Sequence, residues 1–441
     1  MQPLKGKSLL LVGLTLFSMF FGAGNLIFPP FLGVQAGSNT WIAMIGFLLS
    51  AVGFPILGVI AIAKAGGLSV LASRVHPKFA FVFTLLIYLS IGPCLAIPRT
   101  AGTSFEMAVV PFMAGGGTMQ MTRIVYSAVF FVIALLLALR PDKLSDRLGK
   151  ILTPCLLTLI AIIFLGCVFR PIGAYGMPMG IYGKTPLIQG FLDGYLTMDT
   201  IAALNFGIII ALNIQARGIT EEHAIVKGTM KAGLIAGVIL LLVYSALAHI
   251  GAMIGETFGA AENGARTLNQ VVQFQFGSIG MVILAAIFFI ACLNTCVGLL
   301  SCCSNYFESI IPSISYRSWV FLFAGASFVI SNAGLNKILE ISVPVLNILY
   351  PISIVLIVLG LLHPLIQKLP MIYPAAISLT GIVSIGSVLA SLNPDIPYLT
   401  KLLNYLPFQA LQLGWVLPAL LGMGIGVIIS LIQKVHLQSQ S

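Results

Sequence analysis

The sequence predicts an all-α integral membrane protein with twelve transmembrane helices in a single domain, 1–441. Of the 441 residues, 59% are hydrophobic and only 8% are charged, whereas soluble proteins carry about 25% charged residues. Apolar segments recur along the whole chain, most of them near the roughly 20 residues that a helix needs to cross a bilayer. Lysine and arginine gather between alternate segments, as expected when cationic loops stay in the cytoplasm.

The twelve predicted spans are the apolar segments of the chain, of which the ninth is short. Their limits are Ser8–Leu32, Trp41–Ala63, Phe79–Ile97, Ile124–Leu139, Ile151–Phe169, Leu187–Ile214, Gly228–Ile250, Ile279–Leu300, Trp319–Ile330, Ile338–Leu362, Met371–Leu392 and Leu413–Ile432. Two long loops, Arg170 to Gln189 and Gly255 to Gly277, are expected on the outside.

The distribution of cationic residues predicts that both termini are cytoplasmic. With all twelve segments crossing, 15 of the 22 cationic residues lie inside, which satisfies the positive-inside rule. The inside set is Lys5, Lys7, Lys64, Arg74, Lys78, Arg140, Lys143, Arg147, Lys150, Arg217, Lys227, Lys231, Arg317, Lys368 and Lys434. The outside set is Arg99, Arg123, Arg170, Lys184, Arg266, Lys337 and Lys401. The first apolar run continues past the small residues that could mark a signal-peptide cleavage site, so we expect the first span to be retained.

The first span contains an interruption, Gly22-Ala23-Gly24-Asn25, followed by Pro29-Pro30. Glycine and asparagine favour a break, and the two prolines are expected to prevent an early, smooth helical restart. A backbone break within the membrane is tolerated only where the chain lines a cavity or is buried in protein. We therefore expect this segment to present backbone amides and carbonyls to a small charged solute, as broken helices do in secondary transporters.

The sixth span has a comparable interruption from Asp193 to Thr200, which contains Asp199. Two hydrophobic segments broken at corresponding positions of two halves point to a transport site. Asp199 would attract a substrate ammonium or an ion, or hold the break open, or it would cap a helix that begins at Thr200. Asp193, at the other end of the interruption, is expected at the membrane interface.

Three further spans carry polar residues with competing interpretations. Arg99 and Glu106, which follow the third span, would line or clamp an outer vestibule, or anchor the helix at the interface. Glu340 begins a helical face with Pro344, Asn347 and Pro351 that is expected to face the bundle in a gating or structural role; the alternative is an exposed Glu340. Asn294 and Thr295 in the eighth span would offer oxygen ligands to a hard cation, or hydrogen-bond to neighbouring helices.

Several function classes lack sequence support. The five histidines form no HExxH motif, and no phosphate-binding Gly-Lys-Ser/Thr loop or nucleophile elbow is present, so an enzyme or an ATP-driven pump is not expected. The net charge of +10 reflects topology and does not predict nucleic-acid binding. The seven cysteines lie in or beside apolar runs and are expected to pack as small hydrophobes.

The chain resembles the branched-chain amino acid–cation symporters, the LIVCS family of bacterial inner membranes. The resemblance rests on three long strings, FFGAGNLIFPP at Phe20 to Pro30, GPCLAIPRTAGTSFE at Gly92 to Glu106 and GYLTMDTIAAL at Gly194 to Leu204. It implies a LeuT-type fold of two inverted five-helix repeats, 8–170 and 187–362, followed by two peripheral helices within 371–432. It also implies a multi-pass inner-membrane protein surrounded by lipid.

The resemblance implies roles for individual residues. The amides near Gly22, Ala23 and Gly24 would bind the substrate carboxylate, and Asn25 would brace the break. Carbonyls near Ser18 and Phe21, with Thr295, would bind Na⁺, whereas Asn294 occupies a position where related transporters often have another residue type. The pocket would be completed by the segment from Asp199 to Asn205, including Ala202.

The function implied is sodium-coupled uptake of leucine, isoleucine and valine, with Na⁺ as the coupling ion and no organic cofactor. An apolar pocket distinguishes one methylene by only about 1–3 kcal/mol, so the three amino acids are expected to be shared substrates. One alternative is a proton-coupled carrier of the same fold in which Asp199 or Glu340 titrates. Another is a passive channel, although the chain has few charged residues to form a selectivity ring.

Overall fold

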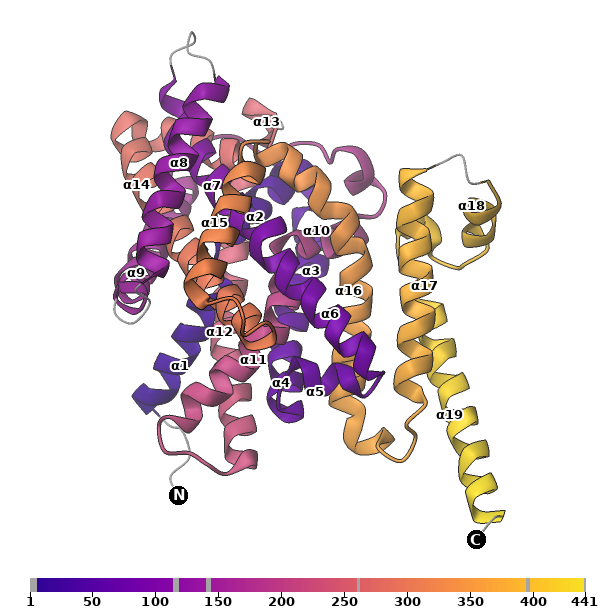
Figure 1. Cartoon of the computed structure of the whole chain (residues 1–441). Coiled ribbons are helices and arrows are strands. Elements are labelled where there is room, and N and C mark those ends of the chain that lie inside the picture. The colour runs from indigo at the N-terminus through magenta and orange to yellow at the C-terminus, as the bar shows by residue number, and fades with distance from the viewer. Residues whose placement is uncertain (1–5, 114–118, 140–143, 260–261, 394–396, 440–441) are drawn as a thin grey trace.

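The computed structural model describes residues 6–113, 119–139, 144–259, 262–393 and 397–439, which form helices with no β-strand among them (Figure 1). In chain order the α-helices are α1 (Gly6–Phe20), α2 (Ala23–Ala36), α3 (Thr40–Leu48), α4 (Phe54–Ala65), α5 (Leu68–Ser73), α6 (Pro77–Leu89), α7 (Ala96–Ala108), α8 (Met119–Ala138), α9 (Leu144–Phe169), α10 (Pro186–Asp193), α11 (Asp199–Gln215), α12 (Glu222–Ala252), α13 (Gly255–Phe258), α14 (Gly264–Ile310), α15 (Tyr316–Ser331), α16 (Leu335–Ile366), α17 (Ile372–Leu392), α18 (Pro397–Asn404) and α19 (Val416–Ser439). Short 3-10 or π turns connect or extend them: η1 (Gly37–Asn39), η2 (Leu49–Gly53), η3 (Ser90–Cys94), η4 (Val110–Phe112), η5 (Gly180–Gly183), η6 (Gly194–Thr197) and η7 (Gln409–Leu411).

The prediction of a multi-pass helical membrane protein is confirmed. Within the described residues, eight helices are long and apolar enough to cross a membrane, or nine if the bent pair Pro186–Thr197 and Asp199–Gln215 forms one span. Three shorter apolar helices, Gly6–Phe20, Pro154–Phe169 and Tyr316–Ser331, accompany them. Of the cationic residues counted from the sequence, Lys5, Arg140 and Lys143 lie outside the described residues.

The first predicted span breaks where the sequence indicated, but the expected effect of its prolines is wrong. α1 ends at Phe20, and α2 restarts at Ala23 and continues through Pro29 and Pro30. A membrane helix tolerates interior prolines because neighbouring helices and local adjustments compensate for the lost backbone bonds. The break is therefore short, with only Phe21 and Gly22 between the two helices.

The third predicted span extends beyond its expected end. After α6, the π turn η3 contains Gly92 in a non-helical conformation (φ −94°, ψ −128°), and α7 then continues the same run. The whole segment Pro77–Phe112 qualifies as one membrane span. Arg99 therefore lies within a span and not in the outer loop where the sequence placed it.

The second long loop expected on the outside, Gly255 to Gly277, is largely helical. α13 lies in it, and α14 starts at Gly264 and passes through a kink at Gly277 (φ 60°, ψ −155°). Glycine adopts such a positive φ without a Cβ clash. The start of α14 packs on α2 at Gly264 and donates to α7 from Asn269, so this part of the expected loop belongs to the helical bundle.

The face of α16 that begins at Glu340 is buried at Pro351 but does not point into the bundle at its Glu340 end, contrary to the prediction. Glu340 is exposed, with 69% of its side chain accessible, and pairs only with Lys337 at 2.9 Å among the described residues. Asn347 is half-buried, and its Nδ2 lies 3.4 Å from Oε1 of Gln412, toward the C-terminal helices. The alternative of a solvated Glu340 at the helix end is the correct one.

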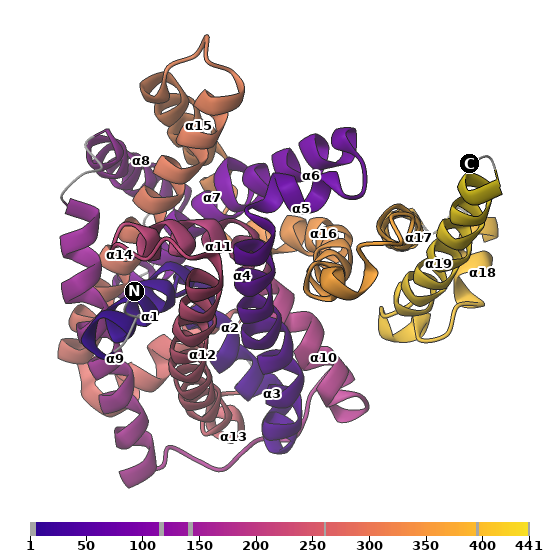
Figure 2. The same ribbon diagram turned by 90° about the horizontal axis from the view of Figure 1, so that it is seen from below.

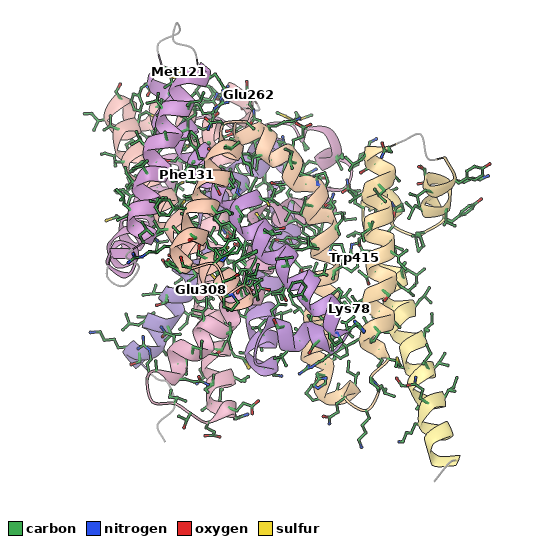
Figure 3. All side chains as sticks on the ribbon, viewed as in Figure 1. Lys78, Met121, Phe131, Glu262, Glu308 and Trp415 are labelled. Atoms are coloured by element: carbon green, nitrogen blue, oxygen red, sulfur yellow. The ribbon has the colours of Figure 1, made fainter. Side chains whose placement is uncertain are left out.

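The C-terminal helices stand to one side of the bundle. Figure 2 shows α17, α18 and α19 beside α16 and away from the other helices, and α16 supplies their main contact with the rest of the molecule. The beginning of α1 and the end of α19 lie at the same end of the bundle (Figure 1). Lys78 and Glu308 lie in the same lower half, and Met121 and Glu262 lie near the opposite end (Figure 3).

Close backbone contact holds α2 against α12. A Cβ atom added to Gly251 of α12 would come within 1.9 Å of the Pro30 carbonyl oxygen, and one added to Gly33 of α2 within 2.0 Å of the Ala248 oxygen. Small residues at such contacts let membrane helices approach closely. This packing supports the second half of the broken first span.

We therefore expect Gly251→Ala to destabilise the protein, because the backbone oxygen of Pro30 cannot move aside as a flexible side chain would. Overpacking of this kind costs about 1–3 kcal/mol. Thermal unfolding of purified protein in detergent would report it as a lower Tm. The matched control is Gly325→Ala, since a Cβ at that helical glycine meets nothing within 4 Å. Equal Tm values for both variants would contradict the close contact.

Candidate functional site

The two broken spans meet at one cavity inside the bundle. The first break lies between α1 and α2, and the second lies at Met198, between η6 and α11. Met198 has φ 65°, an uncommon conformation for a residue other than glycine, which turns the chain sharply there. The empty space between the lining residues of the cavity, including the part open to solvent, is about 430 Å³. It is lined by Met19, Phe20, Gly22, Ala23, Gly24, Asn25, Ile91, Ala96, Arg99, Thr100, Thr197, Met198, Asp199, Ala202, Phe206, Thr295 and Leu299.

Asn25 connects the two breaks through its side chain. Its Oδ1 accepts a hydrogen bond from the Gly22 amide at 3.1 Å, across the break in the first span. Its Nδ2 donates to Asp199 Oδ2 at 2.7 Å and lies against the Tyr244 hydroxyl of α12. Tyr244 also donates to Asp199 Oδ2 at 2.9 Å. All three side chains are buried, so the Asn25 side chain connects the break in the first span to the carboxylate of the second.

Asp199 does not cap its own helix. α11 begins at Asp199 and its N-cap is Met198, so the predicted helix start at Thr200 is one residue late. The carboxylate instead accepts hydrogen bonds from Asn25 and Tyr244 on two other helices. A buried carboxylate needs such donors because a charge out of water is costly.

Arg99 lies in this cavity and not in an outer vestibule. Its side chain is 4% exposed, and Nη1 donates to the Leu196 carbonyl in the sixth-span break at 2.6 Å. Its guanidinium carbon lies 5.4 Å from the centre of the Phe28 ring. Glu106 is two turns along α7 and pairs with Arg266 of α14 at 3.5 Å. Of the two charged residues expected at an outer vestibule, only Arg99 lines the cavity.

Thr295 is the predicted ion-site residue that lines the cavity. Its hydroxyl donates to the Ala291 carbonyl at 3.1 Å. A Cβ at Gly22 would lie 3.3 Å from the Thr295 methyl and 3.6 Å from its hydroxyl oxygen, so Thr295 packs against the first-span break. Of the other two predicted residues, Ser18 lies near the end of α1 and Phe21 lies in the break that follows it, and neither lines the cavity.

Two predicted residues lie beside the cavity without lining it. Asn205 on α11 is 2% exposed, and its Nδ2 has no partner in the described part of the chain. Asn294 on α14 has a buried Oδ1 that likewise lacks a partner among the described residues. Ala202, in contrast, lines the cavity one turn after Asp199.

Asp193 is separate from this site. Its carboxylate accepts hydrogen bonds from the Tyr182 hydroxyl of η5 and from Gln189 Nε2, the latter at 2.9 Å. Burial, together with the Asp193 carboxylate, raises the pKa of Tyr182 well above its ordinary value, so the hydroxyl remains a donor. The pair joins the start of the sixth span to the preceding loop.

Tyr244 was not predicted from the sequence. It is the single tyrosine in the apolar run Gly228–Ile250, and a lone tyrosine in a span is weak evidence for a site. Apolar side chains that line the cavity, such as Ile91, Met198, Phe206 and Leu299, were not predicted either, because apolar residues occur throughout the chain. The predicted third span ended at Ile97, two residues before Arg99, so the sequence placed Arg99 outside the membrane span that contains it.

Comparisons with known sequences cover nearly the whole chain. The family model described as "Branched-chain amino acid transport protein" matches residues 5–433. The branched-chain amino acid permease BraB of Bacillus subtilis is 40% identical over 427 residues, or 96% of each chain. The branched-chain amino acid transport system 2 carrier protein of Pseudomonas aeruginosa is 41% identical over 432 residues, or 97% of each chain.

Solved structures resemble the fold at low sequence identity. Mhp1 in an inward-facing conformation aligns with a TM-score of 0.62 and 13% identity, covering 96% of this chain and 91% of that one. MhsT in complex with L-phenylalanine aligns with a TM-score of 0.59 and 13% identity, covering 98% and 99%. The fold is therefore of the LeuT-like kind that these two proteins share. The sequence matches settle the family: the chain belongs to the branched-chain amino acid transport proteins, and it is a transporter and not an enzyme.

Proposed function

We propose that this protein is a secondary active transporter that couples inward sodium flow to the uptake of leucine, isoleucine and valine by alternating access. The main observation behind the proposal is that both broken spans border the same cavity. It brings a helix N-terminus, a buried carboxylate and a threonine hydroxyl to one place inside a helical bundle. Relatives whose names specify branched-chain amino acid transport support the substrate class.

The polar groups of the cavity suit the two charges of an amino acid. The first amides of α2, at Ala23 and Gly24, have no intrahelical partner and lie at the positive end of the helix dipole. They would bind the substrate carboxylate. Asp199 would attract the ammonium group from the other break, while Asn25 and Tyr244 hold its carboxylate in place.

The apolar residues of the cavity suit a branched aliphatic side chain. Ile91, Ala202, Phe206 and Leu299 line it together with Met198. Such a surface offers no hydrogen bond that would distinguish one aliphatic side chain from another. We infer that leucine, isoleucine and valine share the site.

Sodium coupling is proposed from the oxygen atoms near the first-span break. The last carbonyls of α1 lie at the negative end of the helix dipole. The backbone near Ser18 and Phe21, with the Thr295 hydroxyl, would supply hard oxygen ligands. Thr295 packs against Gly22, which places this hydroxyl at the break.

Proton coupling is the second candidate, and Asp199 is the observation that favours it. This carboxylate is 3% exposed, lines the cavity and forms no ion pair with any described residue. Protonation would remove a costly buried charge. The membrane potential would drive either ion inward by about 2.3 kcal/mol per charge per 100 mV.

The orientation proposed for the membrane follows from the cationic loops. We propose twelve spans with both termini in the cytoplasm of a bacterial cell and the chain surrounded by inner-membrane lipid. Residues 8–170 and 187–362 would be the two inverted repeats, and the helices within 371–432 would be peripheral. The position of α17 and α19 beside α16 supports the last point.

Uptake of labelled leucine into proteoliposomes tests the function and the ion together. We expect an inward sodium gradient to accumulate leucine, and unlabelled isoleucine and valine to compete. A pH gradient without sodium should be ineffective. Accumulation driven by protons alone would replace sodium by the proton as the coupling ion. Uptake indifferent to both gradients would refute secondary active transport.

Thr295→Val should weaken sodium coupling, because it removes one oxygen ligand while keeping the side-chain shape. A hydrogen-bonding or ion contact to a charge is worth about 1.5–3 kcal/mol, so the sodium concentration for half-maximal uptake should rise about 10-fold or more. Thr15→Val is the matched control, since the Thr15 hydroxyl makes the same bond to the carbonyl four residues earlier but on an exposed face. An unchanged sodium dependence in Thr295→Val would contradict the proposed ion site.

Asp199→Asn should reduce leucine uptake by at least about 10-fold, because the ammonium loses its charged partner. The amide keeps the size of the side chain, so folding can be checked by gel filtration and Tm. Glu340→Gln, at an exposed carboxylate, should leave uptake unchanged. Wild-type uptake by Asp199→Asn would exclude this carboxylate from both substrate binding and proton coupling.

A further inference from the structure

Arg99 is a buried cation that Asp199 attracts from the same cavity without a direct ion pair. Only 4% of the side chain is exposed, and no described residue forms a salt bridge with it. One nitrogen donates to the Leu196 carbonyl at 2.6 Å, the group lies over the Phe28 ring, and Nε has no partner among the described residues. A charged group in a membrane span is costly and usually faces a cavity or a partner. Arg99 faces the cavity, so an anion bound there would supply the direct ion pair that the described residues do not form.

The guanidinium lies directly against the N-terminus of α2. A Cβ atom on Gly24 would come within 2.6 Å of Arg99 Nη2 and within 3.0 Å of Cζ. Gly24 is the second residue of α2, where amides lack partners and the helix dipole is positive. Two positive groups thus share one corner of the cavity. They repel each other unless an anion lies between or beside them.

The neighbouring groups indicate which anion fits. The corner borders the proposed carboxylate position at Ala23 and Gly24, and a guanidinium binds a planar carboxylate with two parallel hydrogen bonds. Asp199 lines the same cavity from the opposite break, and its Oδ2 accepts from Asn25 and Tyr244. A fixed cation and a fixed anion in one cavity match the two charges of an amino acid.

We propose that Arg99 binds the substrate carboxylate together with the first amides of α2, so that it makes the transporter select for a free carboxylate. The inference rests on the proposed function and adds the residue that recognises the carboxylate. It also explains why position 24 is glycine: a side chain there would displace the guanidinium. A small free anion such as chloride would satisfy the same groups, and the experiment separates the two.

The test compares binding of leucine and of leucinamide, which keeps the ammonium and the side chain but has no carboxylate. Binding is measured on purified protein in detergent, with sodium, by competition against labelled leucine or by ligand-induced thermal shift. Wild-type protein should prefer leucine. Arg99→Met should weaken leucine binding about 10- to 100-fold, the loss expected for a charge-assisted contact. The same variant should bind leucinamide as well as or better than wild type, because a repelling positive charge has been removed.

Arg123→Met is the matched control. Arg123 also lies over a phenylalanine ring, that of Phe105 at 5.5 Å, but it does not line the cavity. Its substitution should leave the preference for leucine unchanged. Gly24→Ala provides a second variant that keeps the arginine: its methyl group should displace the guanidinium and weaken leucine binding without weakening leucinamide binding.

The outcomes separate the hypotheses. Loss of leucine and leucinamide binding to the same extent in Arg99→Met would mean that the arginine only supports the structure. Unchanged leucine binding in both Arg99→Met and Gly24→Ala would overturn the proposal. If replacing chloride by gluconate abolishes the difference between wild type and Arg99→Met, the residue binds a free anion. Wild-type protein that binds no leucine would instead refute the proposed function.

Discussion

The hydrogen bonds of Asn25 to Asp199 and Tyr244 are the interaction on which the candidate site depends. Each of the two broken spans leaves backbone groups without helical partners, in surroundings that supply little water. The Asn25 side chain bonds to the amide of Gly22 in one break and to the carboxylate of the other, and Tyr244 adds a third helix. Three helices are thereby held around one cavity. Losing any of these groups would leave a buried donor or carboxylate unsatisfied.

Backbone contacts of small residues give this network a rigid support. α2, which carries Asn25, packs closely on α12, which carries Tyr244, through Gly33 and Gly251. The distance between these helices leaves no room for a Cβ atom. Side-chain hydrogen bonds of definite length can then form between them. The hydrogen bonds of the site therefore depend on the close backbone contact between α2 and α12.

The part of α14 that precedes the Gly277 kink packs on two of the helices that border the cavity, α2 and α7. Asn269 donates to the Glu106 carbonyl at 3.1 Å, and Arg266 pairs with the Glu106 carboxylate at 3.5 Å, which ties α14 to α7. A Cβ on Gly264 would come within 1.6 Å of the Ile27 carbonyl oxygen, so the same segment rests on α2. This part of α14 therefore contacts both the helix that carries Arg99 and the helix that carries Asn25.

The sequence by itself determined the class of the protein and the position of its two breaks. Apolar segments of about 20 residues that recur along a chain are typical of membrane helices. Two of these segments are interrupted, at Gly22 to Asn25 and before Asp199. Composition and the pattern of apolar residues were therefore sufficient to predict the class of the protein and its two breaks. Only the tertiary structure decided which way each polar side chain points and how deeply it is buried. Glu340 turned out to be exposed, Arg99 lies inside the bundle, and Tyr244 joins Asp199 from a span whose sequence gives no sign of it. Helical spacing shows which residues share a face, but only the packing of neighbouring helices decides where that face points.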